Sequence, residues 1–409
     1  MRSWLNDLVL AARGILRQPR RSALAGVAIS GGVIALMLAG GFVEWNFWNY
    51  REATIHSQLG HLRVHKEGFT QAGQADPFAF LLPEKATERA EIARLPGVKE
   101  VAPRLFFSGL VSLGDATVSF VGEGVEPGRE RELSGGLRIR EGRQLTDADA
   151  DGLLVGEGLA ANLGVKPGDR VALVANTEAG GVNAIEATVT GIFSSISKAY
   201  DDVALRLSRA AAAKLLRVDG AHAWVVLLDR TDRTDEVFEA LRSRFAGSGL
   251  EFSRWIDSSD FYRKSRDLYA RQVVIMKLII AIIIVLSISN SQMMSVIERT
   301  GEVGTAMALG SSRATVLRRF FIEGLVLGVA GAAAGVALGM LLAWLISSIG
   351  IPIPPPPGMA HGYDGEIMVT PGIVADAVVL AVLTTCAASV YPAWKASRLV
   401  IVDALRFNR

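Results

Sequence analysis

Two long stretches without a charged side chain constrain the fold of this chain most. Residues 278–297 and 324–363 contain no Asp, Glu, Lys or Arg. About 20 apolar residues cross the hydrocarbon core of a bilayer as a helix, so each stretch predicts a membrane span. Two more apolar segments, 22–43 and 373–394, predict one span each. The sequence therefore predicts four transmembrane helices.

Composition adds a substantial water-exposed part to these spans. Half of the 409 residues are hydrophobic and 21% are charged. The mean hydropathy is +0.32. The net charge of +2 gives no electrostatic footprint for nucleic acid. The lone cysteine, Cys386, excludes an intrachain disulfide and a cysteine-based metal cluster.

Basic residues orient the spans. Five arginines lie in residues 1–21, and lysine or arginine also follows the fourth span at Lys395, Arg398, Arg406 and Arg409. The loop over residues 350–371 has neither residue type. The positive-inside rule then predicts that both termini are cytoplasmic. Apolar residues at helical spacing in 1–21 predict an amphipathic helix on the membrane surface.

Residues 51–260 have the character of a soluble α+β domain, either one domain or two subdomains. Strands are predicted at 61–64, 101–113, 117–121, 171–175, 184–193, 203–207 and 224–228. Helices are predicted at 83–95, 156–163, 209–215 and 234–245. Ser208 and Thr234 are the predicted N-caps of the last two helices.

The segments follow one another in a simple order. They are a cytoplasmic helix (1–21), span 1 (22–50), the external α+β domain (51–260), a stalk with span 2 (261–297), a cytoplasmic insert (298–319), span 3 (320–349), an external loop (350–371), span 4 (372–396) and a cytoplasmic tail (397–409). The stalk has no interior Gly or Pro to bend it. The proline run in 351–358 excludes helix and predicts a stiff hairpin loop.

Glycines in the third span recur at intervals of three or four residues. They are Gly324, Gly328, Gly331, Gly335 and Gly339. Such spacing removes side chains from one face of a helix and predicts close packing against another helix in lipid. The sequence leaves open whether that helix belongs to this chain or to a second copy.

Catalytic motifs are missing from the sequence. It has no G-x-x-x-x-G-K phosphate loop ending in Ser or Thr, no H-E-x-x-H and no G-x-S-x-G. We therefore predict that the chain is not an enzyme and binds no metal. His56, His61 and His65 cluster in the sequence, and His61 and His65 are expected to be a satisfied or solvated surface pair on or beside a strand.

Two acidic features have alternative interpretations. Residues 147–152 imitate the start of an EF-hand loop, but Gly158 stands where the loop needs a bidentate Glu, so a solvated turn is favoured. Asp376 lies about one turn inside the fourth span, where interfacial water could reach it. Proton coupling at Asp376 is the less favoured interpretation.

The cytoplasmic insert carries a family pattern. It comprises Glu298, Arg299, Glu302, Val303, Gly304, Ala308, Leu309 and Gly310, followed by Phe320, Glu323 and Gly324. The stretches 154–169, 189–193 and 391–406 add three further signatures in the same order. Together they resemble the ABC-transporter permeases that include the MacB-type exporters, FtsX and the lipoprotein-releasing LolC and LolE permeases. Gly301 departs from the pattern, which usually has a basic residue before the second Glu.

The resemblance implies an architecture and a set of partners. The fold would be an α-helical membrane domain of four spans, with an α+β periplasmic domain inserted between spans 1 and 2, in the bacterial inner membrane. Two copies of a separate cytoplasmic ATPase would bind ATP and Mg, and this chain would bind no cofactor. A second permease subunit, identical or a sister, would complete the core. The residues implied in coupling to the ATPase are Glu298, Arg299, Glu302, Gly304, Leu309 and Gly310.

The cargo is less well specified. Residues 60–69 resemble the lipoprotein-releasing branch, which implies extraction of lipoproteins or another amphiphile with help from membrane lipids and a periplasmic chaperone. A candidate cavity would be lined by Phe42, Trp45, Phe47, Trp48, Met276 and Ile280. The aromatic residues alternatively form an interfacial belt. The other open functions are MacB-like efflux through a periplasmic adaptor and an FtsX-like signalling scaffold that transports nothing.

Overall fold

The computed structural model describes residues 19–73, 75–355, 358–359, 361–401 and 404. The chain divides into two compact units. The helical unit comprises Met1–Phe47, Ser265–Pro352 and Asp364–Arg409, and the sheet unit comprises Trp48–Lys264 and Ile353–Tyr363. The predicted amphipathic helix over 1–21 lies almost entirely outside the described residues, as do Arg406 and Arg409.

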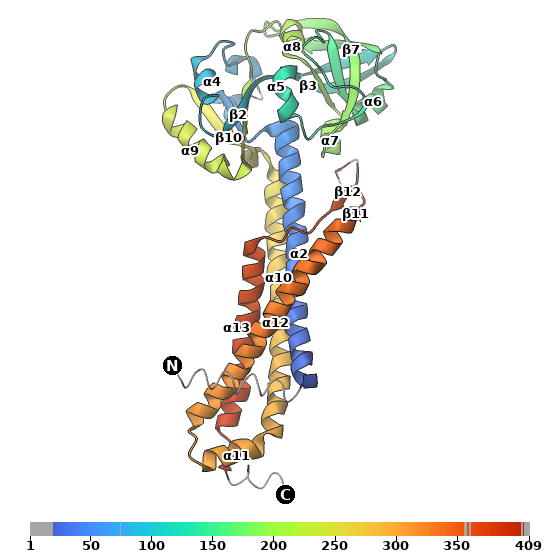
Figure 1. The fold of residues 1–409 in the computed structure, drawn as a ribbon. Coiled ribbons are helices and arrows are strands. Elements are labelled where there is room, and N and C mark those ends of the chain that lie inside the picture. The colour runs from blue at the N-terminus through green and yellow to red at the C-terminus, as the bar shows by residue number, and fades with distance from the viewer. Residues whose placement is uncertain (1–18, 74, 356–357, 360, 402–403, 405–409) are drawn as a thin grey trace. The chain divides into compact units, whose positions relative to one another are not determined.

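Four long helices, each apolar enough to cross a membrane, are present in the described part of the chain (Figure 1). They are α2 (Pro19–Thr54), α10 (Asp260–Glu298), α12 (Arg313–Ile349) and α13 (Pro371–Ser397). Each one contains a predicted span and extends beyond it. The stalk and the second span are one unbroken helix of 39 residues, α10.

The four helices share one apolar core within the helical unit. Ile29 and Met37 of α2 are fully buried there, together with Ile288 of α10. Small residues on α13, such as Ala381 and Ala388, let the neighbouring backbones approach closely. Lipid gives apolar helices no hydrophobic reason to associate, so such close packing carries much of their association.

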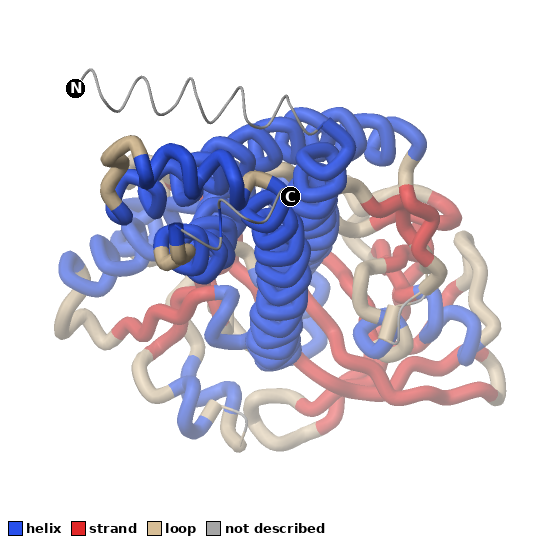
Figure 2. The backbone as a smooth tube through the Cα atoms, turned by 90° about the horizontal axis from the view of Figure 1, so that it is seen from below, coloured by secondary structure: helices blue, strands red, loops and turns tan. Residues whose placement is uncertain are grey.

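The sheet unit is built on a ten-stranded mixed sheet, drawn in red in Figure 2. The strand order is β10-β1-β9-β2-β3-β8-β5-β7-β4, and β6 pairs with β2 and β7. The strands are β1 (Leu62–Lys66), β2 (Val98–Leu113), β3 (Ala116–Val125), β4 (Arg138–Gly142), β5 (Gly152–Gly156), β6 (Arg170–Asn176), β7 (Val182–Ser194), β8 (Ala204–Ser208), β9 (Ala223–Leu228) and β10 (Leu250–Arg254). The β3–β8 and β5–β7 pairs are parallel.

Short helices accompany the strands in the sheet unit. They are α3 (Phe69–Ala72), α4 (Thr87–Ile92), α5 (Pro127–Leu133), α6 (Glu157–Leu163), α7 (Lys198–Asp201), α8 (Arg209–Leu216) and α9 (Thr234–Arg244). One-turn segments are η1 (Ile55–Leu59), η2 (Pro77–Phe80), η3 (Thr231–Arg233) and η4 (Trp255–Ser258). Because η1 directly follows α2, the first long helix ends inside the sheet unit.

Two large apolar cores lie along the continuous sheet, together with a small cluster around Phe193. The larger core packs α6 and α8 on the strands around Leu153 and Leu205. The smaller one packs α4 and α9 around Trp224. The sheet is continuous through both cores, which favours one domain over two separate subdomains.

Local predictions for the sheet unit differ from the structure in a few places. All seven predicted strands are present, but β4, β5 and β10 were not predicted. The helix predicted at 83–95 is shortened to α4. Ser208 caps α8 as predicted, since its side chain accepts a hydrogen bond from Ala211 N. The prediction for Thr234 was wrong: Arg233 holds the N-cap position, and Thr234 Oγ1 donates to Thr231 O instead.

The proline-rich connection between α12 and α13 forms a short hairpin, as its composition predicts. Strands β11 (Ile351–Ile353) and β12 (Tyr363–Gly365) pair with each other. The tip of this hairpin belongs to the sheet unit. Lys198 N donates to Gly358 O at 2.8 Å, and His361 Nε2 lies 2.6 Å from Glu157 Oε2. These two contacts tether the tip to α6 and α7.

Candidate functional site

The insert that is predicted to be cytoplasmic folds into a short helix, α11 (Thr300–Ala308), between α10 and α12. Arg299 is its N-cap residue, and Gly310 follows it with φ of +100°, a conformation that favours glycine. Ser312 then caps α12, since its side chain accepts a hydrogen bond from Thr315 N. The local sequence therefore specifies both ends of the turn.

The inner face of α11 is fixed by packing. Val303 and Met307 are buried against Val316 and Phe320. A Cβ atom added at Gly304 would lie 2.6 Å from Ala404 Cβ. The lack of a side chain at Gly304 thus lets α11 pack closely against Ala404.

Ion pairs connect α11 to the long helices. Arg299 Nη1 lies 3.0 Å from Glu323 Oε2 on α12, and Arg299 Nε lies 3.5 Å from Glu302 Oε2. The Arg299 guanidinium also lies over the Phe320 ring. Glu298 pairs with Arg21 of α2. Sequence reasoning named Arg299 and Glu298 for contact with a partner, whereas both have partners inside this chain.

The outer tip of α11 presents an apolar side chain to solvent. Leu309 is 85% exposed, so its apolar side chain does not stabilise this chain by burial. The Glu302 side chain, 63% exposed, lies on the same short helix. Among the predicted coupling residues, Leu309, Gly310 and Glu302 form the accessible tip, and the others hold it in place.

The glycines of α12 contact three helices of the same chain. A Cβ at Gly324 would lie 2.0 Å from Ser389 Oγ of α13 and 2.3 Å from Gln292 Nε2 of α10, and one at Gly328 would lie 2.7 Å from Thr385 Cγ2 of α13. The other three glycines face α2. There a Cβ would meet Ile29 at Gly331, Val33 at Gly335 and Met37 at Gly339, at 2.7–3.0 Å.

Residues proposed for a lipid-accessible cavity have mixed environments. Ile280 is 9% exposed and packs against Gly32, and Trp45 is 8% exposed. The Phe47 ring contacts Tyr269 edge-on at 5.4 Å. Met276 and Phe42 are half-buried, and Trp48 is exposed. In this conformation Ile280 belongs to a packed helix contact, so the cavity stays a prediction.

The acidic residue of the fourth span has a cationic partner. Asp376 Oδ2 accepts a hydrogen bond from Lys277 Nζ of α10 at 2.7 Å. Lys277 directly precedes the uncharged stretch of α10, and Asp376 lies near the start of α13, so an ion pair explains both charges without invoking proton transport.

His61 and His65 are buried, which corrects the expectation of a surface pair, whereas His56 is half-buried. His61 is 1% exposed and accepts from Leu228 N through Nδ1, and His65 Nδ1 lies 3.0 Å from His222 O. Burial lowers the pKa of His61, His65 and His222 to about 4. No group of three or more possible metal ligands occurs among the residues that the structure describes.

The acidic turn that imitates a calcium loop is held by protein groups. Asp149 accepts two hydrogen bonds from Arg143, both at 2.6 Å, and another from Thr146 N. Asp147 accepts from Gly128 N. These partners occupy the carboxylates, in agreement with the solvated-turn interpretation.

A buried charge cluster, which the sequence did not predict, holds the end of the first helix. It consists of Arg104, Arg206, Glu123 and Glu130, all at most 5% exposed. Arg104 donates two hydrogen bonds to Glu130 at 2.7 Å, and Arg206 Nη2 lies 2.7 Å from Glu123 Oε2. The same arginines donate to Gln58 O and Ser57 O of η1, each at 2.6 Å. Two buried cations thus cap carbonyl groups that the helix end leaves unsatisfied.

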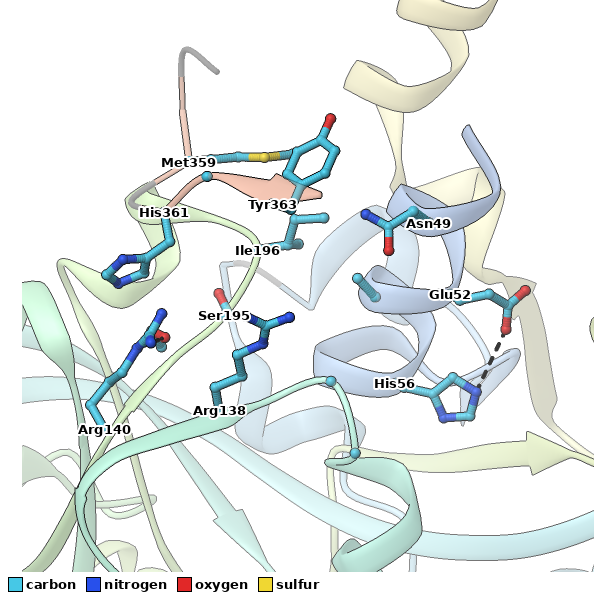
Figure 3. A pocket seen from close by; sticks show the side chains of 15 residues that line it. Asn49, Glu52, His56, Arg138, Arg140, Ser195, Ile196, Met359, His361 and Tyr363 are labelled. Atoms are coloured by element: carbon cyan, nitrogen blue, oxygen red, sulfur yellow. Dashed lines mark hydrogen bonds and ion pairs between the residues drawn. The ribbon is translucent and has the colours of Figure 1, made fainter. Parts of the chain in front are cut away.

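An open cavity of about 460 Å³ lies beside that helix end, entirely within the sheet unit. Its walls come from α2 and η1, from β4, from the end of β7 and from the tethered hairpin tip. Figure 3 shows Arg140 beside His361 on one side, Asn49, Glu52 and His56 on the other, and Arg138 between them. The sequence does not indicate this cavity, because its wall residues Asn49 and Tyr363 are 314 positions apart in the chain.

Comparison with known proteins places these features in a family. Residues 22–244 match the family described as MacB-like periplasmic core domain, more than half of the chain, and residues 274–401 match the family described as FtsX-like permease C-terminal. The lipoprotein-releasing system transmembrane protein LolC of Xylella fastidiosa is 27% identical over 275 residues, or 63% of this chain and 65% of that protein.

Two further relatives point in the same direction. An uncharacterized ABC transporter permease of Methanocaldococcus jannaschii is 25% identical over 305 residues, covering 68% of this chain and 69% of that protein. The macrolide export ATP-binding/permease protein MacB of Rhodopirellula baltica is 36% identical over 121 residues, covering 30% of this chain and 16% of that protein. The chain therefore belongs to the ABC-transporter permeases of the MacB, FtsX and LolC type.

Proposed function

We propose that this chain is the permease subunit of an ABC transporter whose ATP is bound, with Mg, by two copies of a separate cytoplasmic ATPase. A second permease subunit, identical or a sister, completes the core. The membrane is the bacterial inner membrane, with both termini cytoplasmic and the sheet unit periplasmic. The chain itself performs no catalysis.

The exposed tip of α11 is the observation that carries the proposal. Leu309 is 85% exposed on a helix whose other face is packed and ion-paired. An exposed apolar side chain on a fixed support is suited to fill a pocket on a partner, because little conformational entropy is lost on docking. The groove of the ATPase is the proposed partner surface.

A displacement of α11 would be transmitted to the long helices α10 and α12. Arg299 and Glu323 connect α11 to α12, and α11 follows α10 after a single residue. Helix α10 continues without an interior Gly or Pro for 39 residues. Sharp helix kinks arise mostly at Pro, Gly or inserted groups, so α10 is suited to transmit displacement along its axis.

The proposed cargo is a lipoprotein or another amphiphile, handled at the periplasmic face with a chaperone receiving it. Support comes from the likeness to LolC, which is named as part of a lipoprotein-releasing system. The predicted lining residues Phe42, Trp45 and Trp48 on α2 would contact acyl chains once α2 and α10 separate. The likeness to MacB, named for macrolide export, makes efflux through an adaptor the outcome to be distinguished.

The test is affinity purification of the tagged full chain in mild detergent, with mass spectrometry and an ATPase assay. We expect the preparation to contain an ABC ATPase and acylated proteins. In the Leu309→Asp and Glu302→Lys variants, the ATPase should no longer copurify with the chain, and ATP hydrolysis in the preparation should be lost. Val182→Asp is the matched control, since Val182 is 70% exposed on β7 of the sheet unit. An ATPase with an adaptor but no acylated protein would indicate efflux, and recovery of a cell-wall hydrolase alone would indicate a signalling scaffold.

A further inference from the structure

The cavity beside the end of α2 carries more positive charge than its own walls neutralise. Arg138 and Arg140 both line it, and both are exposed. They lie two residues apart on β4, where the register with β7 shifts between Ile139 and Glu141, and both border the same cavity. Within the described residues, neither arginine has an acidic side chain at ion-pair distance, and Arg140 Nε donates only to Ser194 Oγ.

The single acidic residue among the described wall residues is already compensated. Glu52 Oε1 accepts hydrogen bonds from Arg51 Nε and Thr231 Oγ1, both at 3.0 Å. Glu52 Oε2 lies 3.7 Å from His56 Nε2. The carboxylate is thus engaged by three partners, of which Figure 3 shows His56, and it does not neutralise Arg138 or Arg140.

Potential donors surround this space from several elements. Arg138 and Arg140 approach from β4 and Asn49 from the end of the first helix, whereas His56 and His361 already contact Glu52 and Glu157. A planar carboxylate is satisfied by one guanidinium fork, whereas a tetrahedral phosphate accepts hydrogen bonds from several directions. We propose that this cavity binds a phosphate ester.

The position of one wall suggests where such a group would come from. Asn49 lies between Trp48 and Tyr50, in the aromatic segment that ends the first span. Aromatic belts occupy the headgroup level of a bilayer. The cavity therefore opens beside the depth at which phospholipid headgroups occur, although a free phosphorylated solute would present the same chemistry.

Binding would also have a mechanical consequence. Met359, His361 and Tyr363 of the hairpin tip form one wall, and the two arginines of β4 form another. A ligand that contacts both would add to the two existing contacts, at Gly358 and His361, that hold the tip on the sheet unit. The hairpin joins α12 to α13, so occupancy of the cavity would restrain the connection between spans 3 and 4.

The test is hydrogen exchange of the full chain in dodecyl maltoside micelles, which contain no phosphate, read at residues 135–140 and around His361. One arm adds glycerol 3-phosphate, and the other adds phosphatidylglycerol to the micelles. We expect slower exchange at both places in at least one arm. Protection by the soluble compound identifies a free phosphate ester as sufficient, and protection only by the lipid identifies a headgroup.

Variants decide whether the arginines are responsible. In Arg138→Gln/Arg140→Gln the phosphate concentration for half-protection should rise about tenfold or more, because two charge-assisted donors are lost. Arg242→Gln, an exposed arginine on α9, should leave it unchanged. Arg138→Gln alone, which leaves Arg140 and its hydrogen bond to Ser194 in place, replaces the double variant if that variant loses protection across the sheet without ligand.

Two results would overturn the proposal: no protection in either arm, or equal protection in the arginine and control variants. The measurement needs neither ATPase nor cargo. A lack of protection by phosphate esters would not contradict the proposed transport function. A lack of ATPase binding would not contradict the proposal that the cavity binds a phosphate ester.

Discussion

Substituting Gly324 by alanine tests how closely the membrane helices pack. The added Cβ would lie 2.0 Å from Ser389 Oγ and 2.3 Å from Gln292 Nε2, closer than any such contact can be. Gln292 and Ser389 are themselves hydrogen-bonded at 2.9 Å, so neither can move without breaking an interhelical contact. Helix α12 must therefore shift away from α10 and α13.

The expected change in the free energy of unfolding is the sum of opposing contributions. Overpacking a well-packed core costs about 1–3 kcal/mol. Loss of an interhelical hydrogen bond in a membrane protein adds roughly 0.6 kcal/mol. Replacing Gly by Ala inside a helix stabilises the helix by about 1 kcal/mol, because Ala has the higher helix propensity. We therefore expect Gly324→Ala to lower the free energy of unfolding by about 2 kcal/mol.

The assay is the temperature at which the detergent-solubilised chain loses its monodisperse elution peak. Gly31→Ala on α2 is the matched control, because a Cβ there meets nothing within 4 Å and should leave stability unchanged or raise it. Gly324→Ala/Ser389→Gly removes one of the two obstructing side chains and should recover part of the loss. Equal stability of Gly324→Ala and Gly31→Ala would refute the packing argument.

Two further predictions concern the sheet unit. Burial lowers the pKa of His61, His65 and His222 to about 4 in the folded chain, below the usual 6.5, so the unfolded chain binds more protons between these values. Stability should be fully present above pH 6.5 and fall toward pH 4, by on the order of 2 kcal/mol per histidine at pH 5; thermal unfolding that is independent of pH in this range would contradict this. Arg206→Met leaves Glu123 without its nearest cation in the buried cluster and should cost about 3–5 kcal/mol, measured as increased hydrogen exchange at η1, whereas unchanged exchange would show that η1 needs no cap.

Features set by local sequence were predicted well. The span and stalk of α10 follow from an apolar run and the lack of a helix breaker, and the hairpin after α12 follows from its prolines. Strand β4 was missed because three of its five residues, Arg138, Arg140 and Glu141, are charged and it pairs on one side only, at the sheet edge.

Features set by long-range contacts could not be predicted. Arg104 meets Glu130 and Gln58 through the fold of the sheet, and no spacing in the sequence indicates that pairing. The histidines near β1 looked like surface residues because β9, which covers them, lies more than 150 residues later. Leu309 was named from a family pattern, but its exposure depends on how Val303 and Met307 pack beneath it.

The most direct test of the central claim is site-specific photocrosslinking from Leu309 in the native host. A photoreactive residue at this position should crosslink to an ABC ATPase, because Leu309 is the exposed apolar tip of α11. The same residue at Val182, exposed on the sheet unit, should not. A crosslinked ATPase from Leu309 alone is the result that the coupling account predicts. No ATPase at Leu309, or equal capture at Val182, would contradict it.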